Sequence, residues 1–194
     1  FALASGFELV FTRDRGDWVN GTVSYSFMKA EGLSETENQG VNYAQWGFPV
    51  FDRPFYLSWD QRHTLKADVL LLLPWRIAAN MLWQFHTGRP YTFYPSKDGF
   101  TPDNPNQLFL PNNRRMARNQ TLDLYVSKDF FFQSKSSGEV DEAPKLIVYL
   151  DARNLLDRLN VRWVDSSGRV GGELGDPSAF YSPRRTSIGL SIKF

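Results

Sequence analysis

The two histidines are the side chains in this sequence best suited to acid-base or metal chemistry. His63 and His86 are the only histidines in 194 residues, and each falls at the end of a segment with strand-like alternation. Successive strand residues point to opposite faces, so the alternation puts His63 on an apolar face and His86 on a polar one. The two rings should therefore share neither a proton nor a metal ion, and no Ser, His and acid arrangement follows from the spacing. We expect polar roles for both, no catalytic residue, and a chain that is not an enzyme.

Thiols and carboxylates offer no clearer chemistry. The chain has no cysteine, which excludes disulfides and thiolate metal sites. Asp98 and Asp103 lie in a segment rich in glycine, proline and asparagine. They lack the regular spacing of oxygen ligands that calcium loops show. We therefore expect neither a metal site nor a cofactor.

Aromatic and arginine side chains collect in the long segments that separate the alternating ones. The aromatic rings could stack on sugars, aromatic groups or apolar groups. The arginines could bind anionic oxygens through paired hydrogen bonds. Long loops also need aromatic residues to pack on one another, so both interpretations stay open. The candidate substrate-binding residues are Trp46, Phe48, Trp59, His86, Arg89, Tyr91, Tyr94, Arg114 and Arg115.

Seven segments with period-two alternation should position these side chains. Each is close to the length of about 9 to 11 residues that a tilted strand needs to cross a bilayer. The predicted strands are 6–13, 18–29, 62–73, 75–87, 119–131, 145–154 and 184–194.

The connections between these strands alternate in length. Those at 14–17 and 74 are short, and the one at 132–144 is intermediate. Compact soluble domains rarely carry several structureless loops of about 30 residues. Outer-membrane barrels, in contrast, combine tight periplasmic turns with long extracellular loops. If the C-terminus is periplasmic, antiparallel pairing puts every long connection outside the cell. The long connections are 30–61, 88–118 and 155–183.

The last predicted strand shows the two faces most clearly. Ile188, Leu190 and Ile192 share one face, and Ser187 and Ser191 lie on the other. The apolar face would meet lipid in an outer-membrane barrel and a second sheet in a soluble carbohydrate-binding sandwich. Charged residues recur on the polar faces of the other strands, which is costly in a sandwich core but not in a hydrated lumen. Aromatic residues at the strand ends also fit the girdles of a membrane barrel. The alternation therefore favours an all-β, antiparallel transmembrane β-barrel.

Composition and patterning exclude two other classes. The net charge is +1 and the 22 lysines and arginines are scattered, so we expect no nucleic-acid partner. The most apolar stretch, 67–85, contains Asp68, Pro74 and Arg76, which argues against a membrane-spanning helix. An open sheet edge in lipid would leave unpaired backbone groups at a cost of several kcal/mol each. We therefore expect residues 1–194 to form one segment of a larger barrel.

Five short motifs occur in order along these strands and loops. They are Trp59-Asp60-Gln61-Arg62-His63, then Thr87-Gly88-Arg89-Pro90-Tyr91-Thr92, then Leu122-Asp123-Leu124 followed by Lys128 and Phe130, then Asn154-Leu155-Leu156-Asp157, and finally Arg184 to Phe194. In this order the motifs resemble the C-terminal part of the barrel of a TonB-dependent outer-membrane receptor. The resemblance covers the chain from about Gly6 to its end.

The resemblance implies a barrel of about 22 strands with an N-terminal plug, placed in the outer membrane of a Gram-negative bacterium. It implies import of a scarce nutrient, such as a ferric siderophore, cobalamin, oligosaccharide or peptide, with energy from the TonB system. The implied partners are outer-membrane lipid, the remaining strands and plug of the same receptor, the TonB complex through an N-terminal region outside this chain, and a surface lipoprotein as a further candidate. Gly189, Ile192 and Phe194 match the signal that such proteins present to the barrel assembly machinery. The alternative is a structural or adhesive outer-membrane barrel that transports nothing and interacts through its long loops.

Overall fold

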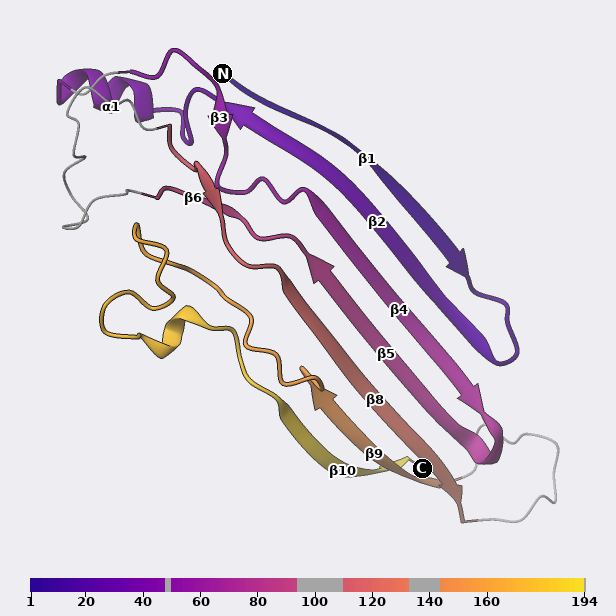
Figure 1. The fold of residues 1–194 in the computed structure, drawn as a ribbon. Helices are drawn as coiled ribbons and strands as arrows, with labels where there is room; N and C mark the ends of the chain where they lie inside the picture. The colour runs from indigo at the N-terminus through magenta and orange to yellow at the C-terminus, as the bar shows by residue number, and fades with distance from the viewer. Residues whose placement is uncertain (48–49, 94–109, 133–143, 194) are drawn as a thin grey trace.

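A single antiparallel sheet dominates the computed structural model, which describes residues 1–47, 50–93, 110–132 and 144–193. Its seven long strands follow the order of the chain, β1-β2-β4-β5-β8-β9-β10, and each is hydrogen-bonded to the next (Figure 1). The strands are β1 (Ala2–Arg13), β2 (Val19–Gly32), β4 (His63–Leu73), β5 (Ile77–His86), β8 (Asn119–Phe131), β9 (Lys145–Arg153) and β10 (Arg185–Lys193).

All seven predicted strands are present, and the all-β class is confirmed. Most boundaries agree with the prediction within two or three residues, and the largest difference is that β1 begins at Ala2 rather than Gly6. The alternation of side chains locates strands well because one face of each strand is apolar over most of its length.

Short elements inside the long connections were expected as loops and form local structure instead. β3 (Phe55–Tyr56) pairs with the end of β2, and β6 (Pro90–Tyr91) pairs with β7 (Arg114–Arg115) in a separate small sheet. Two-residue strands have no detectable period, so the sequence could not reveal them. Among the described residues the helical segments are α1 (Gln39–Gln45) and η3 (Pro177–Ala179) in the long connections and η1 (Pro74–Arg76) in the short β4–β5 connection. Among the described residues no helix has both the length and the apolar character needed to cross a membrane.

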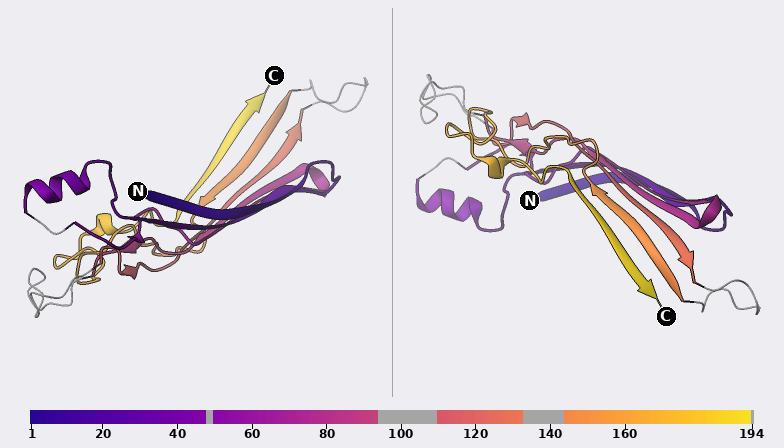
Figure 2. Two further views of the ribbon diagram at one scale, coloured as in Figure 1. Left: turned by 90° about the horizontal axis from the view of Figure 1, so that it is seen from above. Right: turned by 90° about the horizontal axis from the view of Figure 1, so that it is seen from below.

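The two ends of the sheet differ. One end, which we call the loop end, carries the long connections 33–62, 87–118 and 154–184 together with α1, β3 and β6 (Figure 1). The opposite end, the turn end, carries the short connections β1–β2 and β4–β5 and the connection between β8 and β9. Figure 2 shows that the sheet is curved, with β8, β9 and β10 bending away from the plane of β1, β2 and β4.

The register gives the sheet one apolar and one polar face. Side chains on neighbouring strands align in rows because the register partners lie directly opposite one another. One row across six strands consists of Val19, Leu71, Ala79, Val126, Leu150 and Ile188. The next row, on the opposite face, consists of Asn20, Leu70, Asn80, Tyr125, Asp151 and Ser187.

The apolar face is not covered by any other element among the described residues. Ile188 is 77% exposed and Phe11 is 70% exposed, and neither packs into a core. The buried apolar cluster lies at the loop end instead, where Ala30, Phe55 and Leu57 pack together. This distribution is the reverse of that in a water-soluble domain, which buries its apolar face.

The outer edges of the sheet are open within the described part of the chain. β1 pairs only with β2, and β10 pairs only with β9. Closure into a barrel and the total number of strands therefore remain predictions.

Candidate functional site

A buried carboxylate organises the loop end of the sheet. Asp60 is completely buried, and its Oδ1 accepts a hydrogen bond from the backbone N–H of Ala30 at 2.9 Å. Its Oδ2 accepts one from Nε of Arg62 at 3.0 Å and another from Nη2 of Arg115. Nη1 of Arg115 also donates to the carbonyl oxygen of Asp60 at 2.9 Å. The cluster joins the end of β2, the start of β4 and the small β6–β7 sheet.

The hydrogen bonds of this cluster stabilise its charged form. Burial alone would raise the pKa of Asp60, but the donors on Ala30, Arg115 and Arg62 outweigh burial, so the pKa lies below its ordinary value. The pKa of Arg62 moves the opposite way: burial would lower it, yet the bond to Asp60 raises it. Both guanidinium groups also lie over the ring of Tyr56, with Cζ to centroid distances of 4.5 Å for Arg62 and 5.3 Å for Arg115. Asp60, Arg62 and Arg115 thus have a structural role at the loop end of the sheet.

The long connections are bound to one another as well as to the sheet. Nδ2 of Asn112 donates to the carbonyl oxygen of Tyr56 at 2.7 Å and to Oε1 of Glu35. Glu35 in turn accepts a hydrogen bond from the backbone N–H of Ser58 at 2.8 Å. These hydrogen bonds join the described parts of connections 33–62 and 87–118 to each other.

The connection 154–184 is anchored by asparagines at its base. Asn154, 5% exposed and at φ 49°, accepts at Oδ1 from the N–H of Arg158 and donates from Nδ2 to the carbonyl oxygens of Arg158 and Ser182. Asn160 exchanges two hydrogen bonds of 2.8 Å with the backbone of Gln120 in β8. The backbone N–H of Arg184 donates to Oδ1 of Asp157. These bonds give a physical reason for the Asn-Leu-Leu-Asp motif.

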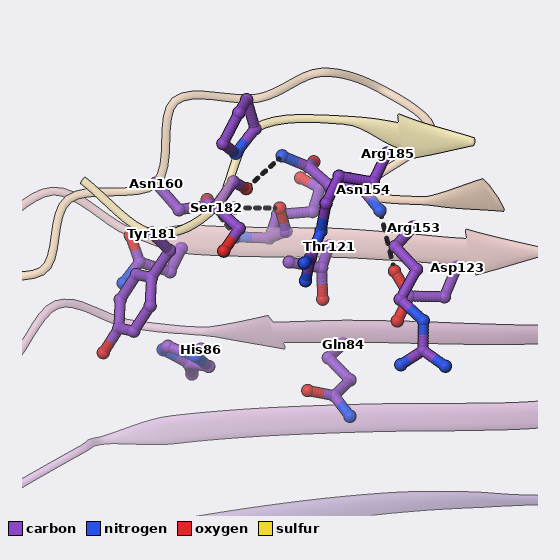
Figure 3. A pocket seen from close by; sticks show the side chains of 13 residues that line it. Gln84, His86, Thr121, Asp123, Arg153, Asn154, Asn160, Tyr181, Ser182 and Arg185 are labelled. Atoms are coloured by element: carbon purple, nitrogen blue, oxygen red, sulfur yellow. Dashed lines mark hydrogen bonds between the residues drawn. The ribbon is translucent and has the colours of Figure 1, made fainter. Parts of the chain in front are cut away.

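A recess of about 320 Å³ lies between this connection and the loop end of the polar face (Figure 3). Its size falls in the range of small-molecule sites. Side chains from β5, β8, β9 and β10 reach it, and the end of the connection lines it from the other side. We call it the arginine recess. Its lining residues are Gln84, His86, Asn119, Gln120, Thr121, Asp123, Arg153, Asn154, Asn160, Tyr181, Ser182, Pro183 and Arg185.

A smaller polar cavity adjoins the arginine recess. The two share His86, Asn119 and Tyr181, and the smaller cavity adds Arg89 and Arg162. Oδ1 of Asn119 is buried without a hydrogen-bond partner among the described residues, while Nδ2 donates to the carbonyl oxygen of Val161 at 2.9 Å. Together the two cavities form one polar region at the loop end.

The predicted substrate-binding arginines occupy different surroundings. Arg89 is exposed beside the smaller cavity, whereas Arg115 is held by Asp60. Arg114 lies over the ring of Phe93, with Cζ 4.3 Å from the ring centroid. Of the three, Arg89 is the one that lines either of these two cavities.

The predicted aromatic residues are also dispersed. Trp46 follows α1 and is 79% exposed, and Trp59 is 43% exposed next to the Asp60 cluster. Tyr91 is half-buried, with its hydroxyl against Gly168 of the connection 154–184, so it contributes to loop packing. Phe48 and Tyr94 lie outside the described residues.

The histidines lie on opposite faces of the sheet, as predicted. Nδ1 of His63 is 2.8 Å from the hydroxyl of Tyr25, and its ring also packs on Phe27. His86 is the register partner of Thr64, the neighbour of His63, and its Nδ1 is 3.2 Å from Nε2 of Gln61. The two rings therefore have different hydrogen-bond partners, Tyr25 for His63 and Gln61 for His86.

Two residues of the predicted assembly signal, Gly189 and Ile192, lie on β10. Ile192 is 55% exposed on the apolar face, and Phe194 lies outside the described residues. A Cβ atom on Gly189 would be 2.2 Å from Cζ of Tyr149, so a larger residue at this position would have to displace the ring. The ring of Tyr149 in turn stacks on Tyr125 with centroids 5.6 Å apart.

Two arginines of the recess are absent from the sequence-based list. Arg153 ends β9, Arg185 begins β10, and the register places them directly opposite each other. Alternation alone assigns Arg153 to the polar face, but the sequence does not give the register that aligns it with Arg185.

Comparison with known protein families, with curated proteins and with solved structures finds no match to this chain.

Proposed function

We propose that this sheet is the C-terminal part of the wall of a transmembrane β-barrel in a Gram-negative outer membrane. In this proposal the complete protein is a TonB-dependent receptor of about 22 strands that imports a scarce nutrient. The loop end faces the outside of the cell and captures the substrate, and the turn end faces the periplasm.

The observation that carries the proposal is the uncovered apolar face of a sheet whose other face is polar. Lipid contact would stabilise side chains such as Ile188, Leu190 and Phe11, which water would not. The polar face carries the ion pair of Lys145 with Asp129, 2.8 Å between Nζ and Oδ2. Such charged pairs suit a water-filled or plugged lumen.

The positions of the aromatic residues support the same placement in a membrane. Trp18 and Trp75 are exposed at the turn end, at 59% and 81%, and Phe130 lies at the same end of the sheet, near the end of β8. Tyr25 and Phe27 form a ring cluster with Phe7 near the loop end of the apolar face. Aromatic rings at both membrane interfaces are typical of transmembrane barrels.

The bound loops support a capture role for the loop end. Because Asp60, Asn112 and Asn154 hold the long connections in place, cavities there are already formed before a ligand arrives. A preformed site loses less conformational entropy on binding than a disordered one does.

An uptake experiment tests the proposal. A strain lacking the gene should lose growth on one member of a panel of ferric siderophores, cobalamin, oligosaccharides and peptides, and a plasmid copy should restore that growth. A protonophore should abolish uptake without reducing surface binding, because the energy comes from the inner membrane. Unchanged growth on every compound, or recovery of the protein in the aqueous fraction without detergent, would contradict the proposal.

A further inference from the structure

The arginine recess contains two like charges that the sheet places in direct opposition. Arg153 and Arg185 are register partners on the polar face, and like charges in directly opposite positions destabilise a sheet. In the described part of the chain, Arg153 has one ion pair, between its Nε and Oδ2 of Asp151 at 3.5 Å. Arg185 has no ion pair among the described residues. The positive charge of the pair is therefore incompletely balanced.

The surrounding cavities add further positive charge. The arginine recess and the adjoining cavity are lined by four arginines, Arg89, Arg153, Arg162 and Arg185, and by one carboxylate, Asp123. That carboxylate is already engaged, since Oδ1 of Asp123 accepts a hydrogen bond of 2.8 Å from the backbone N–H of Asn154. The chain as a whole has a net charge of only +1, so this concentration of arginine is local.

The remaining lining groups are neutral and polar. Gln84 and Thr121 reach the recess from β5 and β8, and Tyr181 reaches it from the connection (Figure 3). Amide and hydroxyl groups of this kind hydrogen-bond the polar part of a small ligand, while arginine binds carboxylate or phosphate oxygens in pairs.

We propose that the arginine recess binds the carboxylate or phosphate group of a small polar ligand, with Arg153 and Arg185 as the residues that contact the anion. This inference deepens the proposed function, since it rests on that function for the recess being a substrate site. The size of the recess and its cover by Tyr181, Ser182 and Pro183 favour a small ligand over a folded partner domain.

Anion binding by the purified protein tests this assignment. The intact polypeptide in detergent micelles is titrated calorimetrically with inorganic phosphate, with acetate and with uncharged glycerol at low ionic strength. We expect saturable binding of phosphate or acetate and none of glycerol. The anion that binds more tightly shows whether the recess prefers a phosphate group or a carboxylate group.

Substitutions locate the binding at the arginine pair. The double variant Arg153→Gln/Arg185→Gln should bind the anion at least about tenfold more weakly, because charge-assisted hydrogen bonds are lost. The variant Arg15→Gln removes an arginine at the turn end and should bind like the unmodified protein. If the double variant does not fold, Arg153→Lys/Arg185→Lys keeps the charge without the paired donors and should show a smaller loss.

Two results would overturn the inference. One is the absence of saturable anion binding by the unmodified protein, as expected if an acidic segment of the polypeptide fills the recess. The other is equal affinity in the unmodified protein and the double glutamine or lysine variant. Neither result depends on uptake, so failed anion binding with intact energy-dependent uptake would contradict this inference and leave the proposed function standing.

Discussion

Removing the charge of Asp60 should release the loop end from the sheet. The substitution Asp60→Asn keeps the shape of the side chain and an acceptor for the N–H of Ala30, but it presents an amide donor or a neutral oxygen to two guanidinium groups. Breaking one side of a buried ion pair costs about 3 to 5 kcal/mol. Arg62 and Arg115 are 23% and 29% exposed, so water offsets part of the loss and we expect about 3 kcal/mol.

Hydrogen–deuterium exchange at the amide of Ala30 measures this change directly. This amide donates to Asp60, and a loss of about 3 kcal/mol in local opening should accelerate its exchange about 100-fold. Asp52→Asn, an exposed carboxylate in the same connection, should leave the rate unchanged. Equal protection of Ala30 in the Asp60→Asn variant and the unmodified protein would refute the structural role of the cluster.

Three further predictions follow from the same contacts. The pKa of Asp60 is lowered below 3.8, so the stabilisation by its charged form is complete above that pH and is lost as the pH falls through the lowered pKa. Trp59 fluorescence should therefore change below about pH 3.8 in the unmodified protein but not in Asp60→Asn. Gly189→Val should displace the ring of Tyr149 and destabilise the protein by about 1 to 3 kcal/mol in urea titrations. Adding Tyr149→Ala should recover part of this loss, and strict additivity of the two free-energy changes would count against the contact. Asn154→Ala should expose the connection 154–184 to limited proteolysis more than Asn154→Gly does, because alanine adds backbone strain at φ 49° to the loss of the amide hydrogen bonds; equal cleavage of the two variants would contradict that reasoning.

The sequence revealed the long strands because each carries its own periodic signal. β10 alternates Ile188, Leu190 and Ile192 with Ser187, Gly189 and Ser191, so its position follows without any tertiary information. β3 and β6 have two residues each and depend on pairing with distant segments. Their existence is set by tertiary contacts that no local pattern encodes.

Only part of the candidate site could be predicted from the sequence, because the rest depends on contacts between distant segments. The polar face and the position of His86 follow from alternation, and both are confirmed. Arg115 looked available for a ligand because the buried carboxylate of Asp60 lies 55 positions away in the chain. Arg153 and Arg185 lie opposite each other because of the register between β9 and β10. Alternation alone does not determine this register, because a shift by two residues keeps every side chain on the same face.

The most direct test of a membrane wall compares neighbouring residues on the two faces. The chain has no cysteine, so single cysteines at Val23 and Val126 on the apolar face and at Ser24 and Ser127 on the polar face can each carry one fluorescent probe. In the intact protein reconstituted in a bilayer, brominated lipid should quench the probes at Val23 and Val126 but not those at Ser24 and Ser127. Equal quenching of both sets, or quenching of the Val23 and Val126 probes by aqueous iodide alone, would contradict a lipid-facing sheet.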